Sequence, residues 1–75
     1  MRYAVILFHS TQYAIWTGKI LKQSGFDYKM IPIPRQLSSD CGYCVRIKQE
    51  DIKDIELLIR TSKIEFQSIE PLPEY

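Results

Sequence analysis

The sequence has no long apolar stretch and no excess of charge of either sign. Its N-terminal apolar run, from Ala4 to Phe8, is shorter than the hydrophobic region of a signal peptide and far too short to span a membrane. Ten basic and nine acidic residues give a net charge of +1, which offers little attraction for nucleic acid or for an anionic membrane. We therefore expect a cytoplasmic protein that binds neither.

Residues that bind metals are also scarce. A tetrahedral zinc site needs about four ligands, and the 75-residue chain has two cysteines and one histidine. A metal would have to be shared across a dimer, so we expect no metal and no bound organic cofactor. A chain this short buries only about 60% of its unfolded surface, so a homodimer would be one way to bury more. In the cytoplasm, Cys41-Gly42-Tyr43-Cys44 is more typical of reactive or metal-binding thiols than of a permanent disulfide.

Four segments have the hydrophobic pattern of β-strands. The first is a continuous apolar run typical of a central strand, and the other three alternate apolar and polar side chains; they cover residues 3–8, 26–31, 43–48 and 63–69. In the third segment, the alternation places Cys44 on the more polar side, opposite Val45 and Ile47.

Two segments have helical spacing. Apolar residues recur every three or four positions over residues 12–23 and 49–61, which predicts two amphipathic helices. A hydroxyl of Ser10 or Thr11 can cap the first of them, and Gly25 can end it in the left-handed conformation. The aromatic residues, including Trp16, fit core and sheet positions better than a base-stacking platform.

The order strand, helix, strand, strand, helix, strand predicts an α+β fold of ferredoxin-like βαββαβ type, with two helices on one face of a four-stranded antiparallel sheet. We expect one domain over residues 1–70 and a frayed, proline-broken tail over residues 71–75. This topology brings Cys41, His9 with the start of the first helix, and the turn at residues 60–63 to one end of the sheet.

Residues 32–44 contain both cysteines and concentrate the reactive side chains of the chain. Because Cys41 precedes Gly42 in a predicted loop, we expect an exposed thiol with a glycine that permits close approach. Positive charge or a helix N-terminus favours the reactive thiolate form of cysteine. The candidates for that role are Arg35, His9 and the first turn after Ser10, whereas the carboxylate of Asp40 would oppose them.

Each candidate also has a purely structural interpretation. Cys41 could be an inert residue in a turn, and Cys44 could be either a resolving thiol for Cys41 or a small strand residue. His9 could simply form hydrogen bonds at a strand end. Ser38 and Ser39 could build the loop through bonds to the backbone, or donate to an anionic sulfur species.

A family resemblance appears in residues that span most of the chain, from about Tyr3 to Ile69. Phe8-His9-Ser10, Ala14, Gly25, Pro32-x-Pro34-Arg35 and the run Ser38-Ser39-x-Cys41-Gly42 followed by Arg46 resemble the small bacterial selenium/sulfur carrier-like domains. The resemblance implies that Cys41 carries sulfur or selenium as a persulfide or its selenium counterpart. Asp40 departs from the usual third serine, and Cys44 from a small apolar residue.

Three functional hypotheses remain open on the sequence alone, with a metal site shared by cysteines across a dimer as a distant fourth. The leading one is a carrier, rather than a stand-alone enzyme, that takes the chalcogen from a donor enzyme onto Cys41 and passes it to an acceptor protein. Arg35, Ser38, Ser39 and the first-helix amides would then stabilise the anionic chalcogen. The second is a thiol-disulfide redox module that uses Cys41 and Cys44. The third is a non-catalytic protein-binding or regulatory domain.

Overall fold

The computed structural model describes residues 2–37, 39 and 41–72. Among these residues the chain forms, in order, β1 (Tyr3–Leu7), α1 (Thr11–Gln23), β2 (Tyr28–Pro32), β3 (Tyr43–Lys48), a single 3-10 turn η1 (Gln49–Asp51), α2 (Ile52–Thr61) and β4 (Ser68–Pro71).

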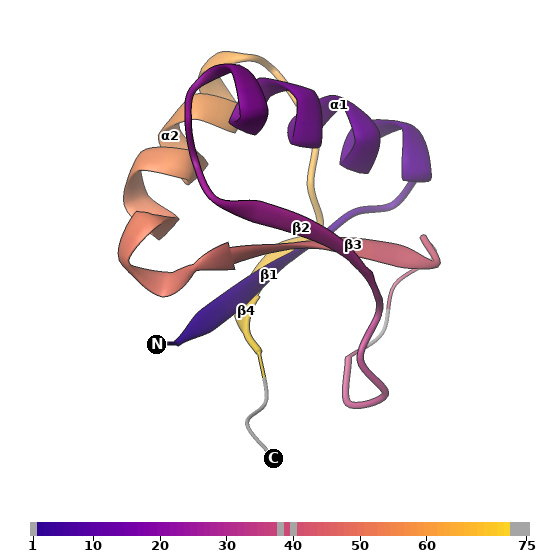
Figure 1. The fold of residues 1–75 in the computed structure, drawn as a ribbon. Coiled ribbons are helices and arrows are strands. Elements are labelled where there is room, and N and C mark those ends of the chain that lie inside the picture. Colours follow the sequence, from indigo (N-terminus) through magenta and orange to yellow (C-terminus); the bar gives the residue numbers. More distant parts are fainter. Residues whose placement is uncertain (1, 38, 40, 73–75) are drawn as a thin grey trace.

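The four strands form one antiparallel sheet in the order β2-β3-β1-β4. β1 is central, and its Val5 lies opposite Arg46 of β3 on one side and Glu70 of β4 on the other. Figure 1 shows both helices on the same face of this sheet. The predicted α+β, ferredoxin-like arrangement is confirmed.

β1 contributes to two separate cores because its successive side chains point to opposite faces of the sheet. Ala4, Ile6 and the following Phe8 belong to the core beneath the helices, which includes Ala14, Leu21, Ile55 and Ile59. Val5 and Leu7 pack on the helix-free face in a smaller core with Cys44, covered by Ile31, Ile33, Leu37 and Leu72. The continuous apolar run of β1 is therefore buried on both faces, as expected of a central strand.

Both helices end in the same backbone geometry. Gly25 follows α1 with φ of +81°, and the amide of the next residue, Phe26, donates to the carbonyl of Leu21. Lys63 occupies the equivalent position after α2 with φ of 59°, and the amide of Ile64 donates to the carbonyl of Ile59. The prediction that Gly25 ends the first helix is confirmed, and Lys63 adopts a conformation that favours glycine.

Two predicted strands differ in their bounds. β2 begins at Tyr28, because Phe26 is still engaged in the turn that ends α1. β4 covers Ser68–Pro71 rather than 63–69. The alternation of Ile64 and Phe66 against polar neighbours arises because both side chains pack against the helix-side core from an irregular segment, without strand pairing.

The C-terminal segment remains paired beyond the point where a frayed tail was expected to begin. Pro71 lies opposite Ala4 in β4, and the amide of Leu72 donates to the carbonyl of Tyr3 at 3.0 Å. Residues 73–75 of the expected tail lie outside the described residues. Among those that are described, no helix has the length and apolar character needed to cross a bilayer.

Candidate functional site

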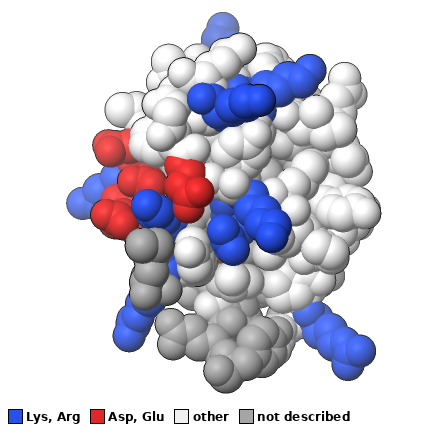
Figure 2. All heavy atoms as spheres, in the orientation of Figure 1, with Lys and Arg blue, Asp and Glu red and all other residues white. Residues whose placement is uncertain are grey.

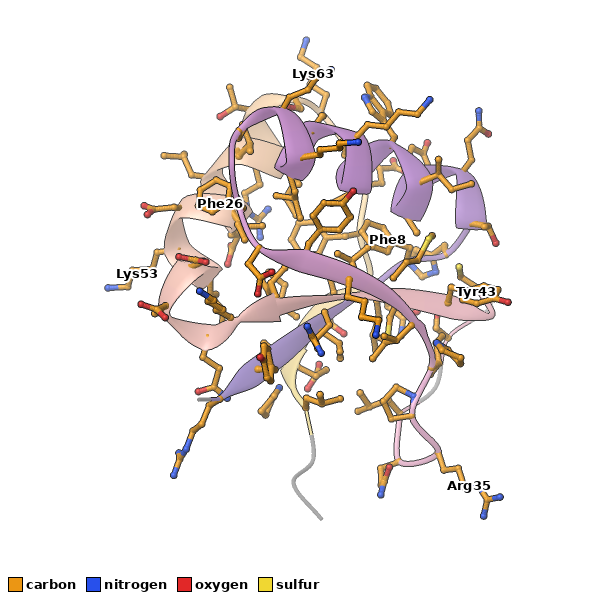
Figure 3. The ribbon with its side chains drawn as sticks, viewed as in Figure 1. Phe8, Phe26, Arg35, Tyr43, Lys53 and Lys63 are labelled. Carbon is orange, nitrogen blue, oxygen red and sulfur yellow. The ribbon has the colours of Figure 1, made fainter. Side chains whose placement is uncertain are left out.

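The candidate site lies in the connection between β2 and β3, which wraps around one end of the sheet. The amide of Ile33 donates to the carbonyl of Gly42 at 3.3 Å, and the amide of Leu37 donates to that of Pro34 at 3.0 Å. The side chains of Ile33 and Leu37 fold under the helix-free face into the smaller core. Figure 3 shows Arg35 at the tip of this loop, pointing away from the body of the protein. The structure therefore does not bring Arg35 to Cys41.

Cys41 returns from the loop into the helix-side core and is only 2% exposed. The expectation of an exposed thiol is wrong, because the loop closes over the core and seats the sulfur among apolar side chains. Its position relative to the first helix is as expected: Sγ lies 3.4 Å from Oγ1 of Thr11, the first residue of α1. Either atom of this contact can be the donor.

Ser39 holds Cys41 in this position. Its hydroxyl donates a hydrogen bond to the Phe8 carbonyl just beyond β1, and it accepts one from the amide of Cys41 at 3.2 Å. The loop-building interpretation of Ser39 is thus the one that the structure shows. Ser38 and Asp40, the other two residues predicted to act here, lie outside the described residues.

The start of α1 lies beside the sulfur of Cys41. Ser10 precedes the helix with extended backbone, yet its side chain accepts no hydrogen bond from the first turn, so the expected Ser10 cap is not formed. The first turn also contains no acidic residue. Neither a first-turn carboxylate nor the Ser10 hydroxyl therefore offsets the partial positive charge that helix N-terminal amides carry. The side chain of Thr11 places Cys41 beside this first turn.

His9 faces a different part of the same end of the sheet. Its exposed side chain lines an open cleft with residues that end and follow α2, among them Arg60, Lys63, Glu65 and Gln67. The predicted convergence of His9 with the turn at residues 60–63 is confirmed. Cys41 is not among the residues that line this cleft.

Cys44 lies in the smaller core, across the sheet from Cys41. It is fully buried, with Sγ 3.9 Å from the Pro32 carbonyl, so its expected place on a polar face is wrong. The face is apolar here because Ile33 and Leu37 cover it. Burial foremost, and the neighbouring Cys41 charge in addition, raise the pKa of the Cys44 thiol to about 11. Both cysteines are free thiols.

Two further observations concern the space around Gly42 and the side chains that could bind a metal. An added Cβ at Gly42 would meet no described atom of this chain within 4 Å, so no close contact within the described part of the domain requires glycine here. Within the part of the chain that the structure describes, no group of three or more His, Cys, Asp or Glu side chains is arranged to hold a metal ion.

Sequence reasoning missed one surface beside the site. Trp16 was assigned to the core, but 45% of its surface is exposed, as is 49% of Ile15. The helical spacing could have indicated that Trp16 is exposed. The buried positions Ala14, Gly18 and Leu21 define a stripe along one side of the helix, and Trp16 lies outside this stripe.

The fold and the loop define the protein as a small α+β domain with a cysteine held against the start of its first helix. A family model described as "Putative Se/S carrier protein-like" matches residues 3–71, and the chain belongs to this family. It is also similar to the uncharacterized protein YtiA of Escherichia coli (strain K12), at 34% identity over 59 residues that cover 79% of this chain and 69% of that protein. No solved structure matches significantly.

Proposed function

We propose that this domain is a carrier that holds sulfur or selenium on Cys41 and transfers it between proteins. Membership of the carrier-like family supports this function. The single observation that carries the proposal is the contact of Cys41 Sγ with Thr11 at the start of α1. A persulfide is anionic at its terminal atom, and helix N-terminal amides and a hydroxyl stabilise such a charge.

The transfer conserves atoms and electrons without an external oxidant or reductant. The Cys41 thiol loses its proton to solvent, and the thiolate attacks the terminal sulfur of a persulfide on the donor enzyme. A new bond forms between the Cys41 sulfur and that terminal sulfur, while the donor S–S bond breaks and its electron pair leaves on the donor thiolate. A thiolate of the acceptor then repeats the same attack and regenerates the Cys41 thiolate. Selenium replaces the terminal sulfur in the second version of the reaction.

Burial of Cys41 makes loop opening a required step of this proposal. At 2% exposure the sulfur cannot meet another thiol, so the bond from Ser39 to the Phe8 carbonyl and its bond with the Cys41 amide must separate first. Such local opening occurs in native proteins at a free energy below that of global unfolding. The closed state would then protect a loaded sulfur from solvent thiols between the two transfers.

Mass measurement tests the carrier function directly. The protein is incubated with sodium polysulfide, freed of excess reagent, and its intact mass compared with that of Cys41→Ser and of the matched control Cys44→Ala. We expect one added sulfur atom on the wild type and on Cys44→Ala, and none on Cys41→Ser. No addition to the wild type, or equal addition to Cys41→Ser, would count decisively against the proposal.

A binding domain in which both cysteines are packing residues is the second candidate. The observation that favours it is the burial of both sulfur atoms, in separate cores. The same separation, with the raised pKa of Cys44, argues against the redox module, because Cys44 stays protonated at neutral pH and faces away from Cys41. Protein isolated from cells without reductant distinguishes the two candidates: bound sulfur or selenium supports the carrier, and its absence supports the binding domain.

A further inference from the structure

Large apolar side chains are exposed together on one flank of the molecule. Ile15 and Trp16 of α1, Met30 of β2 and Tyr43 of β3 are 36% to 49% exposed; we call these four residues the apolar flank. Met30 lies opposite Val45 in the sheet, and Tyr43 lies two residues before Val45, so both point to the helix side of the sheet, beside α1. The flank is thus built where α1 crosses the edge of the sheet.

Two shallow grooves meet at Ile15 on the apolar flank. The first runs along α1 and is lined by Thr11, Gln12, Ile15, Trp16 and Lys19. The second lies between α1 and the edge strand β2, and its lining includes Ile15, Gly18, Lys19, Tyr28 and Met30. A Cβ at Gly18 would come within 3.2 Å of the Tyr28 ring, so glycine at this position lets the helix sit close to the strand.

Lys19 is the charged side chain that lines both grooves. Among the residues that the structure describes, neither lining includes a carboxylate. Figure 2 shows a large uncharged area on the right of the molecule, bordered by Lys and Arg side chains, whereas the acidic side chains in this view gather on the left. A segment that covers the apolar flank would therefore gain from carboxylates at its margins.

The apolar flank is adjacent to the cysteine of the proposed carrier site. Thr11 lines the first groove and contacts Cys41 Sγ at 3.4 Å, and Tyr43 is two residues from Cys41 in the chain. Figure 3 shows Tyr43 at the beginning of β3, beneath the start of α1. A protein bound to this flank would stand next to the loop that has to open.

We propose that the apolar flank is the docking surface for a partner protein that presents a large apolar side chain flanked by carboxylates. Tryptophan, tyrosine and methionine are enriched at the centres of protein interfaces, where few residues supply most of the affinity. The apolar side chain enters the groove at Ile15, and the carboxylates pair with Lys19. That this partner exchanges sulfur with Cys41 rests on the proposed function, whereas the docking itself does not.

Peptide selection tests the docking surface although the partner protein is unidentified. A randomised peptide library displayed on phage is selected on the immobilised wild-type protein, and enriched peptides are synthesised with a fluorescent label. We expect enrichment of a large apolar residue with Asp or Glu within a few positions. In fluorescence anisotropy titrations, Ile15→Asp and Lys19→Glu should each weaken binding at least about tenfold, the equivalent of about 1.4 kcal/mol. Leu57→Ala, a change at a 69% exposed side chain on α2, is the matched control and should bind as the wild type does.

Several outcomes would overturn the docking proposal. They are no enriched peptide, enrichment of basic peptides, or binding that Ile15→Asp does not weaken while circular dichroism shows the variant folded. Sedimentation equilibrium tests a further contradicting outcome. If the wild type forms a dimer that Ile15→Asp abolishes, the occupant of the apolar flank is a second copy of this chain. Sulfur addition is measured on the same wild-type protein, so that a wild type that binds peptide but gains no sulfur refutes the carrier function alone. Cys41→Ser should bind the peptide as the wild type does.

Discussion

The Sγ atom of Cys41 lies 3.4 Å from Oγ1 of Thr11, so the thiol sits against the first residue of α1 although 30 positions separate the two residues in sequence. The contact places the sulfur at the positive end of a helix and, at the same time, inside the helix-side core. This position provides the contact with the helix start on which the proposed carrier function rests, whereas burial of the sulfur blocks access to it. The rate at which the Cys41 thiol reacts with other molecules should therefore depend on how often the loop between β2 and β3 opens.

The first prediction concerns the hydroxyl of Ser39. Ser39→Ala removes both of its hydrogen bonds and should lower the free energy of unfolding by about 1 kcal/mol. Opening of the loop becomes correspondingly easier, so Cys41 should react with a chromogenic aromatic disulfide several-fold faster than in the wild type. Stopped-flow absorbance measures the rate, with Cys44→Ala as the background so that only one thiol remains. Ser24→Ala, on an exposed side chain at the end of α1, is the control; an equal increase there would show that the effect is not local.

The second prediction concerns the small core on the helix-free face. Cys44→Ser places a hydroxyl among Val5, Leu7 and the loop side chains, where the Pro32 carbonyl lies 3.9 Å from the present sulfur. A buried hydroxyl without a good partner costs about 1 to 3 kcal/mol. We therefore expect Cys44→Ser to be less stable than Cys44→Ala in urea denaturation, although serine is closer to cysteine in shape. The reverse order would mean that the site accommodates a polar group.

The third prediction is a pH dependence of stability. Burial raises the Cys44 pKa from 9.0 to about 11, so between these values the native state retains a proton that the unfolded chain releases. The free energy of unfolding should accordingly fall as the pH rises through this window, by at most about 3 kcal/mol from this residue. Lysines and tyrosines titrate in the same range, so the measurement is the difference between wild type and Cys44→Ala. If the free energy of unfolding falls equally with pH in the two proteins, the raised pKa of Cys44 is contradicted.

The fourth prediction compares the ends of the two helices. Lys63 has φ of 59°, and Lys63→Gly should stabilise the protein by about 1 kcal/mol because glycine adopts this conformation without steric strain. Gly25→Ala, at φ of +81°, should destabilise it by a similar amount. Thermal unfolding measures both changes. Gly42→Ala is the control, since its added methyl group meets no neighbour and its backbone is not in the left-handed region. Stabilisation by Gly25→Ala would show that the helix end is formed differently.

The fold was largely predictable from the sequence because its signals are local and periodic. The apolar run of β1, the helical stripe through Ala14 and Leu21, and Gly25 each act within a few residues, and the structure confirms them. The fourth strand was misplaced because alternating apolar residues predict burial on one side but not pairing. Ile64 and Phe66 are held by core packing, whereas pairing with β1 begins at Ser68.

The environment of the two cysteines was less predictable, because it depends on how a long loop folds back on the domain. The sequence places Cys41 beside a glycine and polar residues, which indicates exposure. Burial follows from contacts with Phe8 and Thr11, about 30 positions away, that no local pattern encodes. Cys44 was placed on a polar face for the same reason: the pattern of β3 does not show that Ile33 and Leu37 cover it.

The central position of β1 has a consequence for the rate at which the domain folds. β1 pairs with β3 and with β4, whose last paired residue is Pro71. Both cores contain side chains of β1, so neither core is complete before β3 and the C-terminal strand segment have joined it. Pairing of strands this distant in sequence is slow, so the docking of β4 on β1 should limit the folding rate.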